Sequence, residues 1–238
     1  MGKTYDSLIP SIEQRESAWL QVRERLARTQ RGLLRPTITI SREYGCEAFP
    51  LAERLKELLE GSTGEPWSVF DKSLVEKVAS DEQLSLEFLR HLGDESRAVD
   101  ILKTQFGYLT HHEAYAKVVK HLVQIASVGS AIVVDRGGAV VCQDLKNCRH
   151  FRLEGSFAFR ASTIALRLQV PFPEAEELVR AQSKLREMFI SECLQADITS
   201  PRWYDAVFNN ERLGVETMAQ ACFQIIKGSW PEPDYFRS

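Results

Sequence analysis

Short apolar runs alternate with longer segments in which apolar residues recur every three or four positions. The runs are rich in β-branched and aromatic residues, which predicts strands, and the periodic segments predict helices. The predicted strands are residues 37–40, 67–70, 131–134, 151–153 and 205–209. The predicted helices are residues 51–59, 73–79, 112–128, 139–145, 160–168, 173–196 and 215–227, with two short ones between 81 and 109.

The alternation of strands with helices predicts an α/β fold with a parallel sheet. Parallel strands need long crossover connections, and these place helices on both faces of the sheet. Residues 131–134 (AIVV) form the most continuously apolar predicted strand. Such a run is typical of a strand covered on both faces, so we expect it to be the central strand.

An amphipathic helix is predicted ahead of the first strand. In residues 11–31, the apolar residues Ile12, Trp19, Val22 and Leu26 lie at helical spacing among charges. This stripe packs either on its own domain or on a second subunit, which would make a homodimer. We therefore expect a helical extension over 1–35, a main domain over 36–228, and a tail over 229–238 with little structure.

Composition narrows the functional classes. The chain has 238 residues, 44% of them hydrophobic and 26% charged, as globular proteins do. Its net charge of −3 gives no general attraction for nucleic acid or an anionic membrane. Neither a membrane-spanning apolar stretch nor a signal-peptide core is found in the sequence, which predicts a cytoplasmic protein with no membrane partner.

Cysteine and histidine positions do not predict a metal centre or a disulfide framework. The five cysteines are scattered and include no C-x-x-C pair. His111 and His112 are adjacent, so on a helix they point about 100° apart. Cys46 precedes a predicted helix, where a thiol is either a reactive group with a lowered pKa or a small residue replacing serine.

Polar residues follow each predicted strand. Because the carboxyl ends of parallel strands meet at one edge, where this fold class binds its ligands, we expect these residues to lie together. They are residues 41–47, 71–72, 135–138, 154–160 and 209–212.

These segments resemble the cytidylate-kinase-like proteins, a branch of the P-loop nucleoside monophosphate kinases. ITISREYG at 38–45, followed by the LAERL helix, is similar to the family's opening strand, loop and helix. Five more segments match its motifs in order. They are VFDKSLVEKVA at 69–79, IVVDRGG at 132–138, FRLEGSFAFR at 151–160, SKLREMF at 183–189 and WYDAVFNNERLGVE at 203–216.

The resemblance covers roughly residues 36–226 and implies a three-layer P-loop NTPase-like fold. It implies five parallel strands, a phosphate loop after the first strand, and a lid at about 169–202. It also implies a nucleotide ligand and transfer of a phosphoryl group from an NTP, with Mg²⁺, to a nucleoside monophosphate or similar small acceptor.

The phosphate loop departs from the family pattern. A Walker A loop presents backbone N–H groups, a lysine and a Ser or Thr to phosphate and Mg²⁺. Residues 41–50 (SREYGCEAFP) have one glycine and no lysine, whereas the family typically shows G-S-G-G. Glu47 and Ala48 lie where glycines would be, Phe49 adds bulk, and Pro50 lacks an N–H. A carboxylate beside a triphosphate repels it.

The resemblance nonetheless assigns candidate site residues. The catalytic candidates are Arg136, Arg160, Lys184 and Arg186, which would neutralise the transferring phosphoryl group. The nucleotide- or phosphate-binding candidates are Ser41, Arg42, Glu43, Tyr44, Gly45, Cys46 and Arg212. The acceptor-binding candidates are Asp71, Lys72, Arg136 and Gly137. No residue is assigned as a dedicated metal ligand; Mg²⁺ would be held by the nucleotide and solvent, with Asp71 or Asp135.

Each assignment has a structural alternative. Arg136 and Arg160 form either phosphate contacts or internal salt bridges, and Lys184 and Arg186 lie either over the site or on a solvated helix face. The chain is therefore either a nucleotide kinase or a non-catalytic module of the same fold that senses a ligand or binds a protein. A kinase for a non-nucleotide substrate is a third hypothesis.

The role of Arg136 can be tested by truncation. If it binds an acceptor, Arg136→Ala should abolish calorimetric binding of CMP or dCMP with little change in melting temperature. A melting temperature several degrees lower would instead assign Arg136 a structural role.

Overall fold

The computed structural model describes residues 35–70, 110–134, 137–231 and 235–236. In this part of the chain five strands form one all-parallel sheet in the order β2-β3-β1-β4-β5. The strands are β1 (Thr37–Arg42), β2 (Ser68–Phe70), β3 (Ala131–Val134), β4 (Cys148–Glu154) and β5 (Ala206–Asn209). This confirms the predicted α/β class with a five-stranded parallel sheet.

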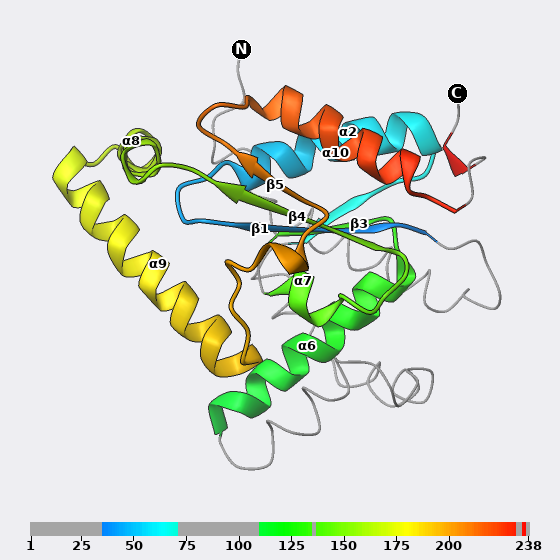
Figure 1. Cartoon of the computed structure of the whole chain (residues 1–238), viewed down its shortest axis with the longest axis horizontal. Coiled ribbons are helices and arrows are strands. Elements are labelled where there is room, and N and C mark those ends of the chain that lie inside the picture. The colour runs from blue at the N-terminus through cyan, green and yellow to red at the C-terminus, as the bar shows by residue number, and fades with distance from the viewer. Residues whose placement is uncertain (1–34, 71–109, 135–136, 232–234, 237–238) are drawn as a thin grey trace.

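Helices cover both faces of the sheet, as Figure 1 shows. One face carries α2 (Ala48–Thr63) and α10 (Val215–Gly228), and the other carries α6 (Thr110–Val128) and α7 (Gly138–Val141). Two further helices, α8 (Phe157–Leu168) and α9 (Phe172–Leu194), pack on each other beyond the carboxyl end of β4. A 3-10 helix, Pro201–Trp203, leads into β5. The arrangement is the three-layer fold that the sequence predicts.

The middle of the sheet is β1, and the prediction that residues 131–134 are central is wrong. β1 pairs with β3 on one side and with β4 on the other, while β3 lies between β1 and the short strand β2. Both interior strands are covered on two faces, so an apolar run does not distinguish them. β1 also extends through Ser41 and Arg42, which pair with Arg152 and Leu153.

Alternation along β1 divides the interior into two layers. Ile38 and Ile40 are fully buried against α2 and α10. Thr37 and Thr39 face the α6 and α7 side, where the Thr39 hydroxyl lies 2.7 Å from Nδ1 of His150. The Thr37 hydroxyl donates to the Ala126 carbonyl of α6 at 2.8 Å, so both buried hydroxyls have partners within the protein.

Two predicted helices differ in length from those observed. α7 ends at Val141 rather than continuing to 145. α2 begins at Ala48, ahead of the predicted residue 51, and Pro50 lies in its first turn. Proline is tolerated there because the first helical N–H groups have no partner inside the helix.

The described residues after α10, 229–231 and 235–236, pack on the domain. Trp230 and Phe236 are 4% exposed and join the cluster between the sheet, α2 and α10. The Tyr235 hydroxyl donates to the Glu65 carboxylate at 3.3 Å, and the same carboxylate accepts from Nε of Arg35 at 2.8 Å. Aromatic burial therefore holds residues 235–236 to the domain.

Several sequence-based predictions lie outside the described residues. They concern the helix at 11–31 with its proposed dimer, the helices within 73–109, and the positions of Asp71, Lys72, Asp135 and Arg136. Among the helices that the structure describes, none combines the length and the apolar character that crossing a bilayer requires.

The buried His150 should make stability depend on pH. Burial lowers its pKa from 6.5 to about 4, so protons bind the unfolded chain more tightly than the folded one. The free energy of unfolding therefore has its full value, as far as His150 is concerned, above pH 6.5. It decreases as the pH falls from 6.5 towards 4. Between pH 7.5 and 5 we expect a loss of about 2 kcal/mol.

Urea unfolding at both pH values, compared with His150→Gln, isolates this contribution. The variant should lose about 2 kcal/mol less than the wild type over the same interval. Equal pH dependence in the two proteins would show that His150 is not the group responsible.

Candidate functional site

The loop between β1 and α2, residues 43–47, turns back on itself at the carboxyl edge of the sheet. The Glu43 N–H continues the β1–β4 ladder by donating to the Leu153 carbonyl at 3.0 Å. The Cys46 N–H donates to the Glu43 carbonyl at 3.1 Å, which closes a tight turn. The Cys46 N–H is therefore directed to a protein oxygen.

The next loop N–H is engaged by the turn after β5. Asn210 is 3% exposed, and its Oδ1 accepts from the Glu47 N–H at 2.7 Å. Its Nδ2 donates to the Glu47 carboxylate at 3.2 Å. Asn209 and Asn210 both belong to the predicted strand-end segment 209–212, and Asn210 is the one that contacts the loop. One amide thus satisfies both the backbone and the side chain of Glu47.

Arg42 and Phe49 fill the α2 side of the loop. The Arg42 guanidinium is buried and donates to the Cys46 carbonyl at 3.0 Å. It also lies 5.4 Å from the centre of the Phe49 ring, a cation–π contact. Phe49 itself is 8% exposed and belongs to the cluster around α2. Phe49, which adds bulk to the loop segment, therefore packs into the domain together with Arg42.

Gly45 lets the loop approach α8 closely. Its φ is +105°, in the region that favours glycine, and it is buried. A Cβ added there would lie 2.7 Å from Cβ of Arg160 and 2.8 Å from the Arg160 carbonyl oxygen. The single glycine of the loop is thus required for packing as well as for backbone conformation.

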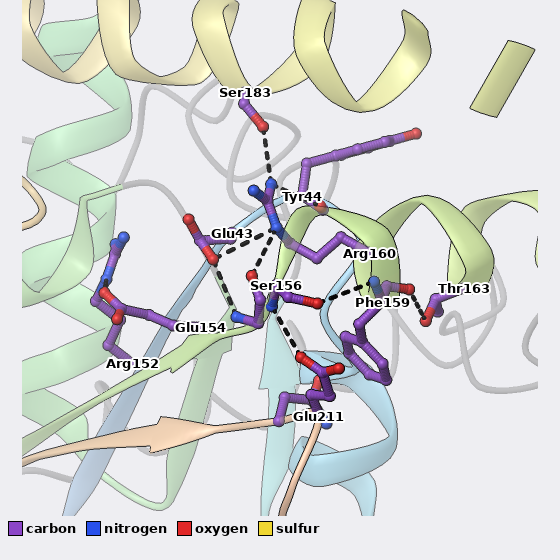
Figure 2. Close-up of polar contacts among 12 residues, drawn as sticks. Glu43, Tyr44, Arg152, Glu154, Ser156, Phe159, Arg160, Thr163, Ser183 and Glu211 are labelled. Carbon is purple, nitrogen blue, oxygen red and sulfur yellow. Dashed lines mark hydrogen bonds and ion pairs between the residues drawn. The ribbon is translucent and has the colours of Figure 1, made fainter. Parts of the chain in front are cut away.

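Arg160 is the cation that the structure brings to the loop (Figure 2). Its Nε lies 3.4 Å from the Glu43 carboxylate and donates to the Gly155 carbonyl at 3.1 Å. The same carboxylate accepts from the Gly155 N–H at 3.0 Å. The Arg160 side chain is 12% exposed and that of Glu43 is 30% exposed, so the pair is partly screened by water from the glutamate side.

Helix α9, which lies within the predicted lid, reaches the loop through Arg160 of α8. Nη1 of Arg160 reaches the Ser183 hydroxyl on α9 at 3.3 Å and the Tyr44 carbonyl at 3.5 Å. Tyr44 packs against the small apolar cluster that joins α8 to α9. On α9, Lys184 is exposed and Arg186 is half-buried. Ser183, the first residue of the family-like segment 183–189, therefore lies against Arg160.

Arg152 is a buried cation that the sequence analysis did not single out. It is 4% exposed in the middle of β4, with Nε donating to the Glu154 carboxylate at 2.7 Å. Its guanidinium lies 5.7 Å from the centre of the Tyr204 ring. The sequence feature that could have identified Arg152 is a charged residue within an interior strand, because solvent reaches neither face of such a strand.

The remaining predicted residues lie around this edge or elsewhere. Ser41 is buried in β1, and Gly137 is buried just before α7 with φ +67°. Arg212 is exposed in the turn after β5, where its N–H donates to Asn209. Cys46 is fully buried, and burial raises the pKa of its thiol to about 12, so it is not a reactive thiolate.

The described residues also contain an open cavity and no metal cluster. The cavity, of about 600 Å³, lies between the end of α9 and residues 195–199, and its lining includes Glu187, Asp197 and Thr199. It is separate from the 43–47 loop. No three His, Cys, Asp or Glu residues among those described are placed to hold a metal ion.

The family model described as the cytidylate kinase-like family matches residues 37–212. The chain belongs to the cytidylate kinase-like family. The match runs from β1 to the turn after β5, so the loop, α8 and α9 all lie within it. The altered loop therefore lies inside the matched region.

A solved structure supports the same fold. The chain resembles the "Crystal structure of uncharacterized protein from Eubacterium ventriosum ATCC 27560", with a TM-score of 0.65 and 16% identity. The alignment covers 82% of this chain and 99% of that one. At this identity the likeness concerns the fold alone. No curated protein sequence matches the chain significantly.

The close approach at Gly45 gives a mutational prediction. Gly45→Ala should lower the free energy of unfolding by about 2 kcal/mol or more, because the methyl group meets Arg160 and the backbone is strained. Gly61→Ala is the matched control, since a Cβ there meets no atom within 4 Å. We expect the control to be neutral or stabilising in urea unfolding; equal destabilisation of both variants would contradict the packing role of Gly45.

Proposed function

We propose that this chain is a non-catalytic member of the cytidylate kinase-like family that senses a small ligand without transferring phosphoryl groups from ATP. The observation that carries the proposal is that backbone N–H groups of the loop already donate hydrogen bonds to protein acceptors. The Cys46 and Glu47 N–H groups, in the segment that aligns with the family's phosphate loop, donate to Glu43 and Asn210. A phosphate would have to displace both acceptors.

Electrostatics supports the same proposal. Glu43 and Glu47 place two carboxylates on the loop, and the Arg160 guanidinium is already paired with the first. The Arg42 guanidinium, directed to the Cys46 carbonyl, binds the loop backbone. A triphosphate with Mg²⁺ would meet carboxylates where it needs donors, so these residues do not fit that group.

A phosphotransferase is the second candidate, and the position of Arg160 favours it. This arginine joins the loop to Ser183 on α9, and Lys184 and Arg186 lie on the same helix. In this alternative Arg160, Lys184 and Arg186, together with Arg136, would neutralise a phosphoryl group passing from an NTP to a nucleoside monophosphate.

Calorimetry with Mg²⁺·ATP, together with a coupled ADP-release assay with CMP and dCMP, separates the two functions. We expect no saturable ATP binding tighter than about 1 mM and no acceptor-dependent ADP release. Acceptor-dependent ADP release that falls in Arg160→Ala would overturn the proposal in favour of the kinase.

A loop-opening variant tests the physical reason. Glu47→Gly combined with Asn210→Ala removes one carboxylate and frees one N–H, so it should bind ATP at least about tenfold more tightly than wild type. The matched control combines Glu47→Gly with Asn209→Ala, because the Asn209 side chain accepts from the Arg212 N–H instead. If both double variants bind ATP alike, the Asn210 contact is not what closes the loop.

A further inference from the structure

One terminal nitrogen of Arg152 is buried without a hydrogen-bond partner. Among the described residues, Nη1 of Arg152 is inaccessible to solvent and meets no acceptor. The side chain is 5% exposed, whereas that of Glu154, whose carboxylate accepts from Nε, is 45% exposed. Buried guanidinium groups normally have their donors satisfied, because leaving one unpaired costs its full desolvation.

Arg152 also lies where this fold class binds ligands. It is in register with Ser41, the residue before the last of β1, and both side chains face the α6 and α7 side of the sheet. Figure 2 shows its guanidinium pointing away from β4, on the side where Glu43 and Arg160 also lie. The carboxyl edge of a parallel sheet is the usual ligand-binding edge.

The contacts of Arg152 hold the group in place and leave Nη1 without an acceptor among the described residues. The Tyr204 ring lies against the guanidinium, and the Tyr204 hydroxyl is fixed by donating to the Ile198 carbonyl at 2.8 Å. The Glu154 carboxylate accepts a hydrogen bond from Nε, and the Asp197 carboxylate attracts the guanidinium electrostatically. A planar, oriented donor pair of this kind suits an oxyanion.

We propose that Arg152 binds a phosphoryl group of a small molecule at the carboxyl edge of the sheet, on the α6 and α7 side. The Nη1 edge would bind phosphoryl oxygens, with the Ser41 hydroxyl alongside. A phosphoryl group is favoured over a carboxylate because its three oxygens can reach both Arg152 and Ser41, and its higher charge competes better with Glu154 and Asp197. The inference rests on the proposed function and names the ligand class of that sensor.

The test uses inorganic phosphate as the probe on the full chain. Phosphate should raise the melting temperature saturably at constant ionic strength, while chloride and acetate should not. In Arg152→Met, which keeps an apolar stem but removes the charge, apparent phosphate affinity should fall at least about tenfold, as expected when a charge-assisted contact of about 1.4 kcal/mol or more is lost.

The matched control is Arg149→Met, on the same strand. Arg149 is satisfied by Ser229 and lies against Trp230, so its loss should change phosphate affinity less than about twofold. If Arg152→Met cannot be purified folded, Arg152→Lys replaces it, with the same expected loss, because lysine cannot reproduce the planar donor edge.

Three outcomes would overturn the assignment: no saturable response in wild type, an unchanged response without Arg152, or an equal response to acetate. Because the probe contains no nucleotide, the result is independent of ATP turnover. If phosphate binding requires Arg152 and the chain also releases ADP, the anion site is supported and the non-catalytic function is rejected. If neither phosphate binding nor ADP release is found, the non-catalytic function is supported and the anion site is rejected.

Discussion

The pairing of Arg160 with Glu43 constrains the carboxyl edge of this domain. Through one guanidinium it connects the end of β1, the Gly155 backbone after β4, the start of α8 and Ser183 on α9. The Arg160 guanidinium is largely shielded from water, whereas Glu43 is 30% exposed, so the arginine is the charge that would be left without compensation if the pair separated. Together with the contact of Asn210 on Glu47, these bonds hold the loop in its conformation.

Much of the fold could be predicted from periodicity. The apolar runs located all five strands of the described sheet, and their alternation with helices implied a parallel arrangement. Strand order was beyond this reasoning, because residues 37–40 and 131–134 are both apolar runs covered on two faces. The docking of Phe236 was also missed, since Pro231 and Pro233 indicate a loop without revealing the aromatic cluster that it meets.

The sequence predicted where the candidate site lies, at the carboxyl edge of the sheet, but it predicted only some of the contacts within it. Strand ends identified the loop and Arg160, but a sequence cannot show that Glu43 neutralises that arginine. Asn210 and Asn209 are chemically identical neighbours, and only the turn after β5 decides which one faces Glu47. Arg152 was hidden for a different reason. The alternation of polar and apolar residues in β4 suggests a solvated face, whereas helices and loops cover both faces.

The cluster of Arg35, Glu65 and Tyr235 has a practical consequence for labelling the protein. The described domain begins and ends within one hydrogen-bonded group, next to the start of β1, whereas Arg160 and the 43–47 loop follow the opposite end of that strand. A fluorophore attached to the surface beside this cluster therefore lies at the opposite end of β1 from the 43–47 loop. Binding experiments with such derivatives can then report on the edge itself.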